Sequence, residues 1–230
     1  TILKTNSYIL LMTQILICEW AIFLKSSGYI IYITKLIGGL MELNKIATVK
    51  TGLVLSRKES KDASERFEYR QLNLKAVCDN GTININDTIP FYASEQLTAS
   101  YLTQVGDIVV KTSEPYTAVY ITEEYANLVI PSHFVVVRVD ITKALPQYIA
   151  WYLNKDRIKK AFSMSCAGML KQIKPTMVGA TEIKLPSLKR QKQVAELYEI
   201  SNQEIKLLEK LIEQKKKYYK ALISNVNRIK

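Results

Sequence analysis

The sequence predicts an α+β fold in which a β-rich domain is followed by one long helix. Two observations carry this prediction. Apolar residues alternate through several short stretches in the middle of the chain, and the last forty-odd residues contain neither Gly nor Pro, the two residues least favourable in a helix. We divide the 230 residues into a leader (1–40), the β-rich domain (41–186) and the helix (187–230).

The final segment has the periodicity of a helix that pairs with another helix. Its apolar residues recur at alternating spacings of three and four, which is the heptad pattern, interrupted only at Ser201 and Lys215. Leu197, Leu211 and Tyr218 widen the apolar face on one side. The positions of this predicted dimer seam are Val194, Tyr198, Ile205, Leu208, Ile212, Tyr219, Leu222, Val226 and Ile229.

A helix of this length is too long for its own domain to cover. About forty residues at 1.5 Å each span roughly 60 Å, which exceeds a small domain. We therefore expect the apolar face to pack against a partner helix. The alternative is a single surface helix that lies on its own domain.

The charge of the chain favours an anionic partner. The formal net charge is +11, and residues 189–230 hold eleven Lys or Arg and five Asp or Glu, so a large part of the excess lies on the helix. Nucleic acid and a membrane surface both fit this charge, although any one basic residue is also compatible with a solvated surface. The hydrophobic fraction of 48% is sufficient for a folded core.

Cysteine and histidine usage argues against a metal site. Cys18, Cys78 and Cys166 are isolated, without CxxC spacing, and His133 is the only histidine. These are too few ligands for structural zinc, and we predict no metal and no cofactor. Unpaired cysteines are typical of a reducing cytoplasm, which is the expected location.

The first forty residues differ in composition from the rest. Residues 8–24 form an apolar stretch at the short end for a membrane span, with Glu19 near its middle. A membrane-anchored coiled-coil protein is therefore one alternative. A translated upstream region fits better, because Ile37-Gly38-Gly39-Leu40 can be encoded by ATA-GGA-GGT-TTA, a purine-rich ribosome-binding sequence ahead of Met41. We hypothesise that Met41 is the native start.

The first half of the domain is expected to contain a short helix and a hairpin. The spacing of Leu43, Ile46 and Ala47 is helical, and Gly52 could close that helix. Residues 67–74 and 82–86 alternate like strands around an Asp-Asn-Gly turn at residues 79–81, which predicts a β-hairpin.

The second half supplies the expected core. Residues 108–111, 117–121 and 134–139 are short, strongly apolar runs typical of central strands. A proline at the start and apolar residues at helical spacing predict one amphipathic helix from Pro146 to Phe162.

The sequence lacks the motifs of the common catalytic classes. It contains no GxxxxGK[ST] loop, no GxGxxG fingerprint and no Asn/Asp-Pro-Pro-Tyr tetrad of amino-methyltransferases. Glu182-Ile183-Lys184 resembles the end of a nuclease motif, but an edge strand is the better interpretation. A catalytic triad would have to be built on His133, for which a structural or DNA-facing imidazole is more plausible. We therefore predict a chain without catalytic activity.

The order of these elements resembles the specificity subunits of type I restriction-modification systems, from Met41 to Lys230. Four features carry the resemblance: Leu43-x-x-Ile46-Ala47 with Gly52, Gly106-Asp107-Ile108-Val109, Gly168 with Ile173, and Leu185-Pro186-x-Leu188-x-x-Gln191 leading into the long helix.

The resemblance implies a role in DNA recognition. Such a subunit typically has two target-recognition domains, each followed by a helix. The helices pack antiparallel, each domain reads half of a split DNA sequence, and two methyltransferase subunits dock on them. With one domain and one helix, this chain resembles a half-subunit, which implies a homodimer, an inverted-repeat target and modification methyltransferase partners. It leaves open whether the restriction/translocase subunit joins, and whether the chain pairs with a different half. A free-standing DNA-binding regulator is the closest rival function.

Three polar loops are the candidate contacts with double-stranded DNA. Basic side chains there would neutralise phosphates, and polar side chains would read base edges. The candidates are Lys50, Thr51, Arg57 and Lys58 in the first loop, Lys111, Thr112, Ser113 and Tyr116 in the second, and Lys171, Gln172 and Lys174 in the third.

Overall fold

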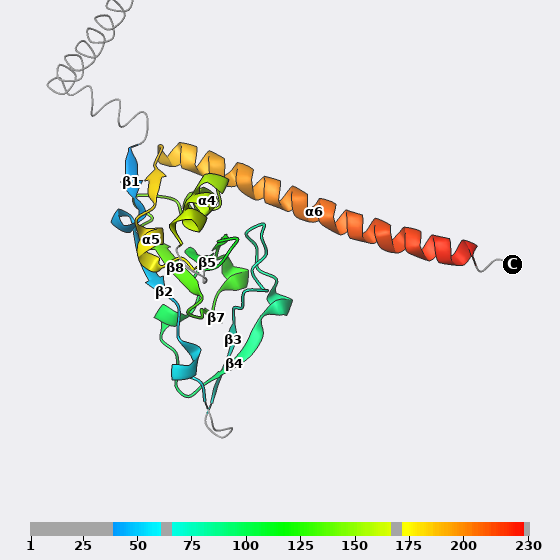
Figure 1. Cartoon of the computed structure of the whole chain (residues 1–230), viewed down its shortest axis with the longest axis horizontal. Helices are drawn as coiled ribbons and strands as arrows, with labels where there is room; N and C mark the ends of the chain where they lie inside the picture. Colours follow the sequence, from blue (N-terminus) through cyan, green and yellow to red (C-terminus); the bar gives the residue numbers. More distant parts are fainter. Residues whose placement is uncertain (1–38, 61–65, 167–171, 228–230) are drawn as a thin grey trace, which may run out of the picture. The chain divides into compact units, whose positions relative to one another are not determined.

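The computed structural model of the chain describes residues 39–60, 66–166 and 172–227 (Figure 1). The chain divides into two units: Lys184–Ser187 belongs to the first, and Glu42–Ile183 with Leu188–Lys230 forms the second. The short strands β1 (Leu40–Glu42) and β9 (Glu182–Lys184) lie where the chain passes between the units. The second unit contains the β-rich domain and the long helix, which confirms the predicted α+β class.

A four-stranded antiparallel sheet forms the centre of the domain. Its strand order is β2 (Ala47–Thr51), β8 (Phe134–Val139), β5 (Asp107–Lys111) and β6 (Ala118–Tyr120). The three predicted core strands are therefore confirmed as neighbours in one sheet. Strand β5 is buried along its whole length and β8 over its first four residues, as expected for central strands.

A second sheet has the order β4 (Ile89–Ala93), β3 (Phe67–Gln71) and β7 (Leu128–Val129). Strand β3 pairs antiparallel with β4 and parallel with β7. Five single turns of 3-10 helix connect the strands: η1 (Leu43–Lys45), η2 (Leu55–Arg57), η3 (Ile85–Asp87), η4 (Ala99–Tyr101) and η5 (Glu123–Tyr125).

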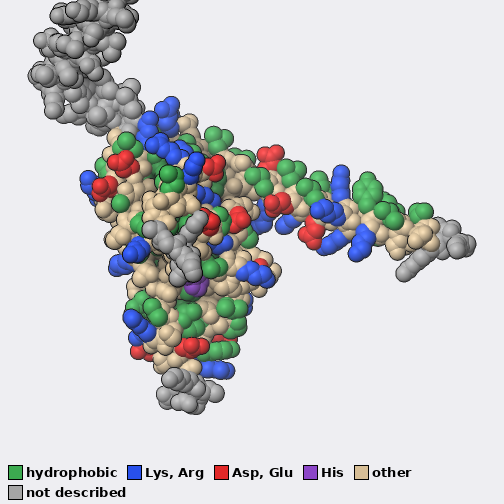
Figure 2. All heavy atoms as spheres, viewed as in Figure 1, with side chains coloured by type: hydrophobic (Ala, Val, Ile, Leu, Met, Phe, Trp, Pro, Cys, Tyr) green, Lys and Arg blue, Asp and Glu red, His purple; other side chains and the backbone are tan. Residues whose placement is uncertain are grey.

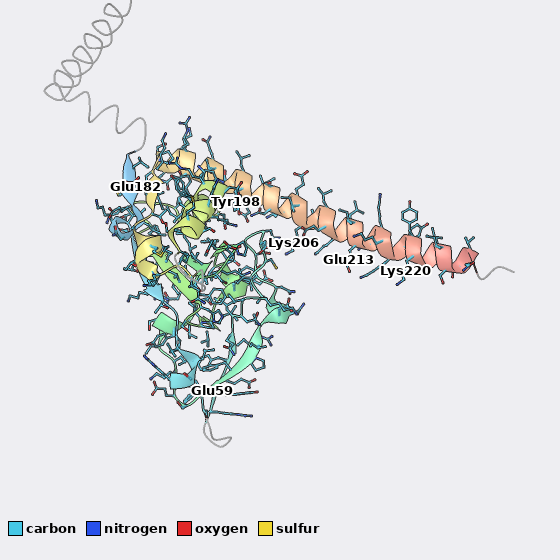
Figure 3. All side chains as sticks on the ribbon, in the orientation of Figure 1. Glu59, Glu182, Tyr198, Lys206, Glu213 and Lys220 are labelled. Carbon is cyan, nitrogen blue, oxygen red and sulfur yellow. The ribbon has the colours of Figure 1, made fainter. Side chains whose placement is uncertain are left out.

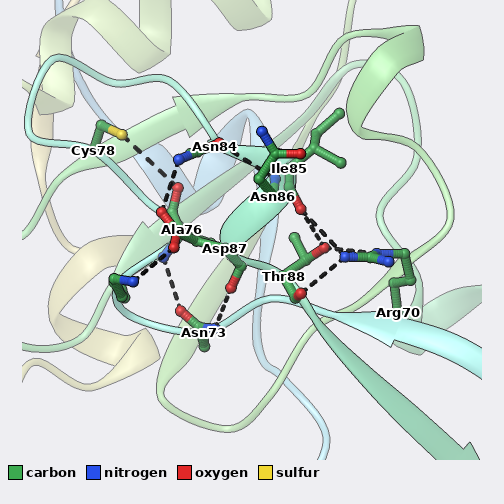
Figure 4. Close-up of polar contacts among 10 residues, drawn as sticks. Arg70, Asn73, Ala76, Cys78, Asn84, Ile85, Asn86, Asp87 and Thr88 are labelled. Atoms are coloured by element: carbon green, nitrogen blue, oxygen red, sulfur yellow. Dashed lines mark hydrogen bonds and ion pairs between the residues drawn. The ribbon is translucent and has the colours of Figure 1, made fainter.

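The predicted hairpin is wrong, although its turn is right. Gly81 has a φ of +80° and its amide donates to the Cys78 carbonyl at 3.1 Å. Residues 82–86 are not a strand, and β3 pairs with β4 instead. The physical reason is a network of side-chain to backbone hydrogen bonds from Asn73 and Asn84 (Figure 4). Asparagine amides compete with a strand ladder for backbone groups and favour turns.

The predicted opening helix is also wrong. Leu43 and Ile46 are buried as the spacing suggested, but one 3-10 turn suffices to place both, and the chain then enters β2. Pairing with β8, from Ala47 opposite Val139 to Thr51 opposite Val135, overrides the local helical pattern.

The predicted helix over residues 146–162 is two helices, α3 (Pro146–Leu153) and α4 (Asp156–Ser165). The break lies at Asn154, whose side-chain amide accepts from the Ala118 amide at 3.0 Å and donates to the Ala118 carbonyl at 2.6 Å. These bonds tie the end of α3 to strand β6. A further short helix, α5 (Pro175–Gly179), precedes β9.

Helix α6 (Leu188–Val226) confirms the predicted long helix. Its first turns pack against α3, where Gln191 is only 1% exposed and accepts a hydrogen bond from the Leu145 amide at 2.9 Å. Figure 1 shows α6 leaving the domain after these turns, and all residues from 203 to 227 are exposed.

Candidate nucleic-acid interface

Three candidate segments meet at one end of the four-stranded sheet. Thr51, the last residue of β2, donates from Oγ1 to the Ser132 carbonyl at 3.3 Å. Thr112 follows β5 and donates from its amide and Oγ1 to the His133 carbonyl, at 3.1 and 2.9 Å. The Ile173 amide donates to the Thr112 carbonyl at 2.8 Å. The turn at residues 132–133 thus binds the first two loops, and the third loop binds the second through Thr112, although all three are far apart in sequence.

Arg57 and Lys58 lie beside the end of β4 instead. Lys58 forms an ion pair with Glu95, and this contact raises the pKa of its ammonium group. The Ser94 amide donates to the Lys58 carbonyl at 2.9 Å. Figure 3 shows the neighbouring Glu59 at the end of the domain remote from α6.

Two candidates prove to be interior side chains. Tyr116 is 1% exposed, its ring packs edge-on against Phe162 at 6.0 Å between centroids, and its hydroxyl donates to Cys166 Sγ at 3.9 Å. Burial raises the pKa of the Tyr116 hydroxyl to about 12. Thr112 is also buried. Both side chains are packed in the interior beneath the loop, so they do not belong to the candidate contact surface.

Lys111 is partly withdrawn from solvent. Its side chain is 9% exposed, and the nearest carboxylate oxygen is Asp79 Oδ1 at 4.0 Å. Lys159 of α4 belongs to the same cluster: burial lowers its pKa, nearby Asp79 opposes that effect, and the positive charge of Lys111 adds to it. Sequence reasoning missed Lys159, because only the packing of α4 brings it to Lys111.

The remaining candidates differ in exposure. Lys50, Thr51, Arg57, Gln172 and Lys174 are exposed, and Ser113 is half-buried. Lys171 and Gly168 lie outside the described residues. Three of the exposed candidates, Lys50, Arg57 and Lys174, are cationic and could neutralise phosphates.

His133 occupies the turn that joins the first two loops. Its ring lies 4.7 Å from the Phe134 ring, and its Nε2 is buried without a hydrogen-bond partner among the residues that the structure describes. Burial lowers the pKa of this imidazole. The neutral form is therefore favoured, which fits the expected structural role better than that of a general base.

Protonation of His133 is expected to destabilise the domain. Because its folded-state pKa lies below the unfolded value of 6.5, the unfolded chain binds the proton more readily, and stability is lost as pH falls below 6.5. We expect a lower free energy of unfolding at pH 5.5 than at pH 7.5, measured by urea denaturation. The His133→Gln variant should show a smaller pH difference, and an unchanged difference would contradict the assignment.

The apolar face of α6 is exposed beyond the domain. Six residues of the predicted seam, Ile205, Leu208, Ile212, Tyr219, Leu222 and Val226, have exposed fractions of 39 to 70%. Leu197, Ile200, Leu207, Leu211, Tyr218 and Ile223 are exposed as well. Figure 2 shows hydrophobic side chains along the upper side of α6, interrupted by charged ones. Ile229 lies outside the described residues.

The first two positions of the predicted seam lie against the domain and are not fully exposed. Val194 and Tyr198 are half-buried, and Tyr198 lines a crevice of about 420 Å³ between α6 and the domain, together with Tyr120 and Glu199. Figure 3 shows Tyr198 where α6 still contacts the domain. This part of the helix is held by its own domain, while the rest of its apolar face has no cover within the described chain.

Two further findings concern metals and membranes. Residues 39–60, 66–166 and 172–227 contain no group of three or more His, Cys, Asp or Glu that could hold a metal ion. Within the same described ranges, no helix is both long and apolar enough to cross a membrane. Residues 8–24 and Cys18 lie outside these ranges.

The chain thus combines a β-rich domain with a long helix whose apolar face is exposed beyond that domain. This is the fold of half a type I specificity subunit. The HsdS subunit from Thermoanaerobacter tengcongensis matches with 14% identity and a TM-score of 0.58, over 81% of this chain and 47% of that one. A chain from a structure on complex assembly and conformational transition of the type I R-M system matches with 14% identity and a TM-score of 0.60, over 84% and 49%.

The resemblance predicted from the sequence is thus confirmed at the level of the fold. The chain spans about half the length of the solved proteins that it matches. No protein-family model matches the sequence, and no curated protein is similar to it.

Proposed function

We propose that this chain is a half-length, sequence-specific DNA-binding specificity subunit. It directs type I modification methyltransferase subunits, and restriction subunits where present, to a split site on cytoplasmic DNA. Residues 41–186 are the target-recognition domain and residues 187–230 the dimerisation and spacer helix. The chain recognises DNA and leaves the chemistry to its partners.

The observation that carries this proposal is the exposed apolar face of α6 on a fold that matches half of a specificity subunit. Exposed leucines, isoleucines and tyrosines along one helix side favour association with another helix. A second copy would supply both the missing helix and the missing domain. Symmetric pairing uses the same surface on both copies, so the two half-sites would be identical and inverted.

The loops at the end of the four-stranded sheet are the proposed reading surface. Lys50 and Lys174 would contact phosphates and supply salt-dependent affinity, while Thr51 and Gln172 are placed to reach base edges. The Thr51 hydroxyl and the Thr112 amide bind the turn at residues 132–133, and the Ile173 amide binds the Thr112 carbonyl, which would hold the contacts in fixed register.

The test is a map of adenine methylation after co-expression with the modification methyltransferase from the same locus. We expect new methylation at a split, inverted-repeat motif, read by long-read sequencing of the host genome. An asymmetric split motif would retain the specificity role but replace the homodimer by two different halves. No new methylation from a soluble, associated pair would contradict the proposed function, and DNA affinity unaffected by the methyltransferase would favour a free-standing regulator.

A further inference from the structure

Two charged residues interrupt the apolar face of α6 itself. Glu204 and Lys215 are eleven residues apart, which is about three helical turns, so both lie on the same side of the helix. The positions three and four residues from Glu204 hold Ile200, Ser201, Leu207 and Leu208, and those around Lys215 hold Leu211, Ile212, Tyr218 and Tyr219. Seven of these eight neighbours are apolar or aromatic, and Ser201 is the exception.

Neither charge has an opposite charge at helical spacing. Two ion pairs elsewhere on α6 do have this spacing, since Lys217 Nζ lies 2.6 Å from Glu213 Oε1 and Lys192 Nζ lies 3.8 Å from Glu196 Oε1. Figure 3 shows Glu213 on the side of α6 that also carries Lys206 and Lys220. Glu204 and Lys215 are thus two charges of opposite sign on the apolar side, and neither can be neutralised by a neighbour on its own helix.

Any partner that covers the apolar face must also satisfy these two charges. A wholly apolar partner would bury both without compensation, which is strongly unfavourable. The required partner is an apolar helix with a cation opposite Glu204 and an anion opposite Lys215. A second copy of α6 meets this requirement only when it runs antiparallel, because a parallel copy places Glu204 against Glu204.

We propose that two copies of α6 pair antiparallel about a two-fold axis between Glu209 and Lys210, in the register set by two ion pairs between Glu204 and the partner copy's Lys215. This inference rests on the proposed homodimer and specifies its geometry. Buried polar pairs of this kind select register and orientation in paired helices.

Four pairs of apolar residues on the face agree with this register. It places Leu197 opposite Leu222, Ile200 opposite Tyr219, Leu207 opposite Ile212, and Leu208 opposite Leu211 of the other copy. A shift by one heptad in either direction places both Glu204 and Lys215 against leucines. The alignment that pairs the charges therefore also brings these four apolar pairs together, while Ile205 lies opposite Gln214.

The test is charge reversal in the full chain, with the dimer dissociation constant measured by sedimentation. Glu204→Lys and Lys215→Glu are each expected to raise that constant at least tenfold, because each creates two like-charge contacts. The double variant should return to within about threefold of the unaltered chain. An equimolar mixture of the two single variants should form a heterodimer, since both ion pairs are restored between the chains.

Glu213→Lys is the matched control, because it reverses a charge on the polar side and should change the dissociation constant less than twofold. Single variants that dimerise normally, or a double variant that does not recover, would overturn the register while leaving the homodimer intact. A monomeric unaltered chain would instead overturn the homodimer on which the register depends.

Discussion

Replacing Leu208 and Leu211 together by glutamate is expected to convert the dimer into a monomer and to abolish sequence-directed methylation. Both leucines are about half exposed on the isolated helix, and in the proposed register four of them meet at the two-fold axis. Burial of a leucine side chain contributes roughly 1.5 to 3 kcal/mol. Losing four should therefore weaken dimerisation by at least about a thousandfold, with added repulsion between the carboxylates.

Sedimentation and methylation mapping are the two measurements, and circular dichroism should show a retained fold because both positions lie beyond the domain. The matched control is Lys210→Glu with Gln214→Glu, which adds the same residue type on the polar side and should leave dimer and methylation intact. A double leucine variant that still directs methylation would contradict the dimer as the active form.

Gly52→Ala is expected to lower the free energy of unfolding by about 3 kcal/mol or more. A Cβ atom at this position would lie 2.2 Å from the Pro131 carbonyl oxygen and 2.4 Å from that of Ile130. Both are backbone atoms: the Ile130 carbonyl accepts from the Leu53 amide at 2.7 Å, and the Pro131 carbonyl accepts from the Phe134 amide at 3.0 Å. Because no side-chain rotation can relieve the overlap, the segments must separate.

Urea denaturation measures this effect, and Gly179→Ala provides the comparison. At that position the nearest atom to an added Cβ is Asn44 Cβ at 3.5 Å, an ordinary contact, and alanine is the better helix former. We expect Gly179→Ala to stay within about 1 kcal/mol of the unaltered chain. Equal stability of both variants would show that the approach at Gly52 is not tight.

The importance of Gly52 was visible in the sequence, but its reason was not. A glycine six residues after Ile46 is compatible with the end of a helix, as the local pattern predicts. Only the parallel contact between Leu53 and Pro131 reveals that the glycine permits two backbones to approach. That contact joins residues almost eighty positions apart, which local pattern cannot detect.

The candidate loops likewise have some features that the sequence shows and others that only tertiary contacts show. Lys50, Lys111 and Lys174 are recognisable in the sequence as basic residues in polar segments, but the hydrogen bonds of Thr51, Thr112 and Ile173 that join these segments are not. The inward orientation of Tyr116 and the cluster of Lys159 with Lys111 and Asp79 depend on how α4 packs. Single loops were therefore predictable, and their assembly was not.

The sequence by itself determined the α+β class, the central strands and helix α6, because these depend on local periodicity and on the absence of Gly and Pro. It also determined that α6 presents an apolar face longer than its domain. The tertiary structure decided which strands pair and where the segment 146–165 breaks into α3 and α4. It also decided which side of α6 its own domain occupies. These features depend on contacts between residues distant in the chain, such as Asn154 with Ala118, whose energies outweigh local propensity.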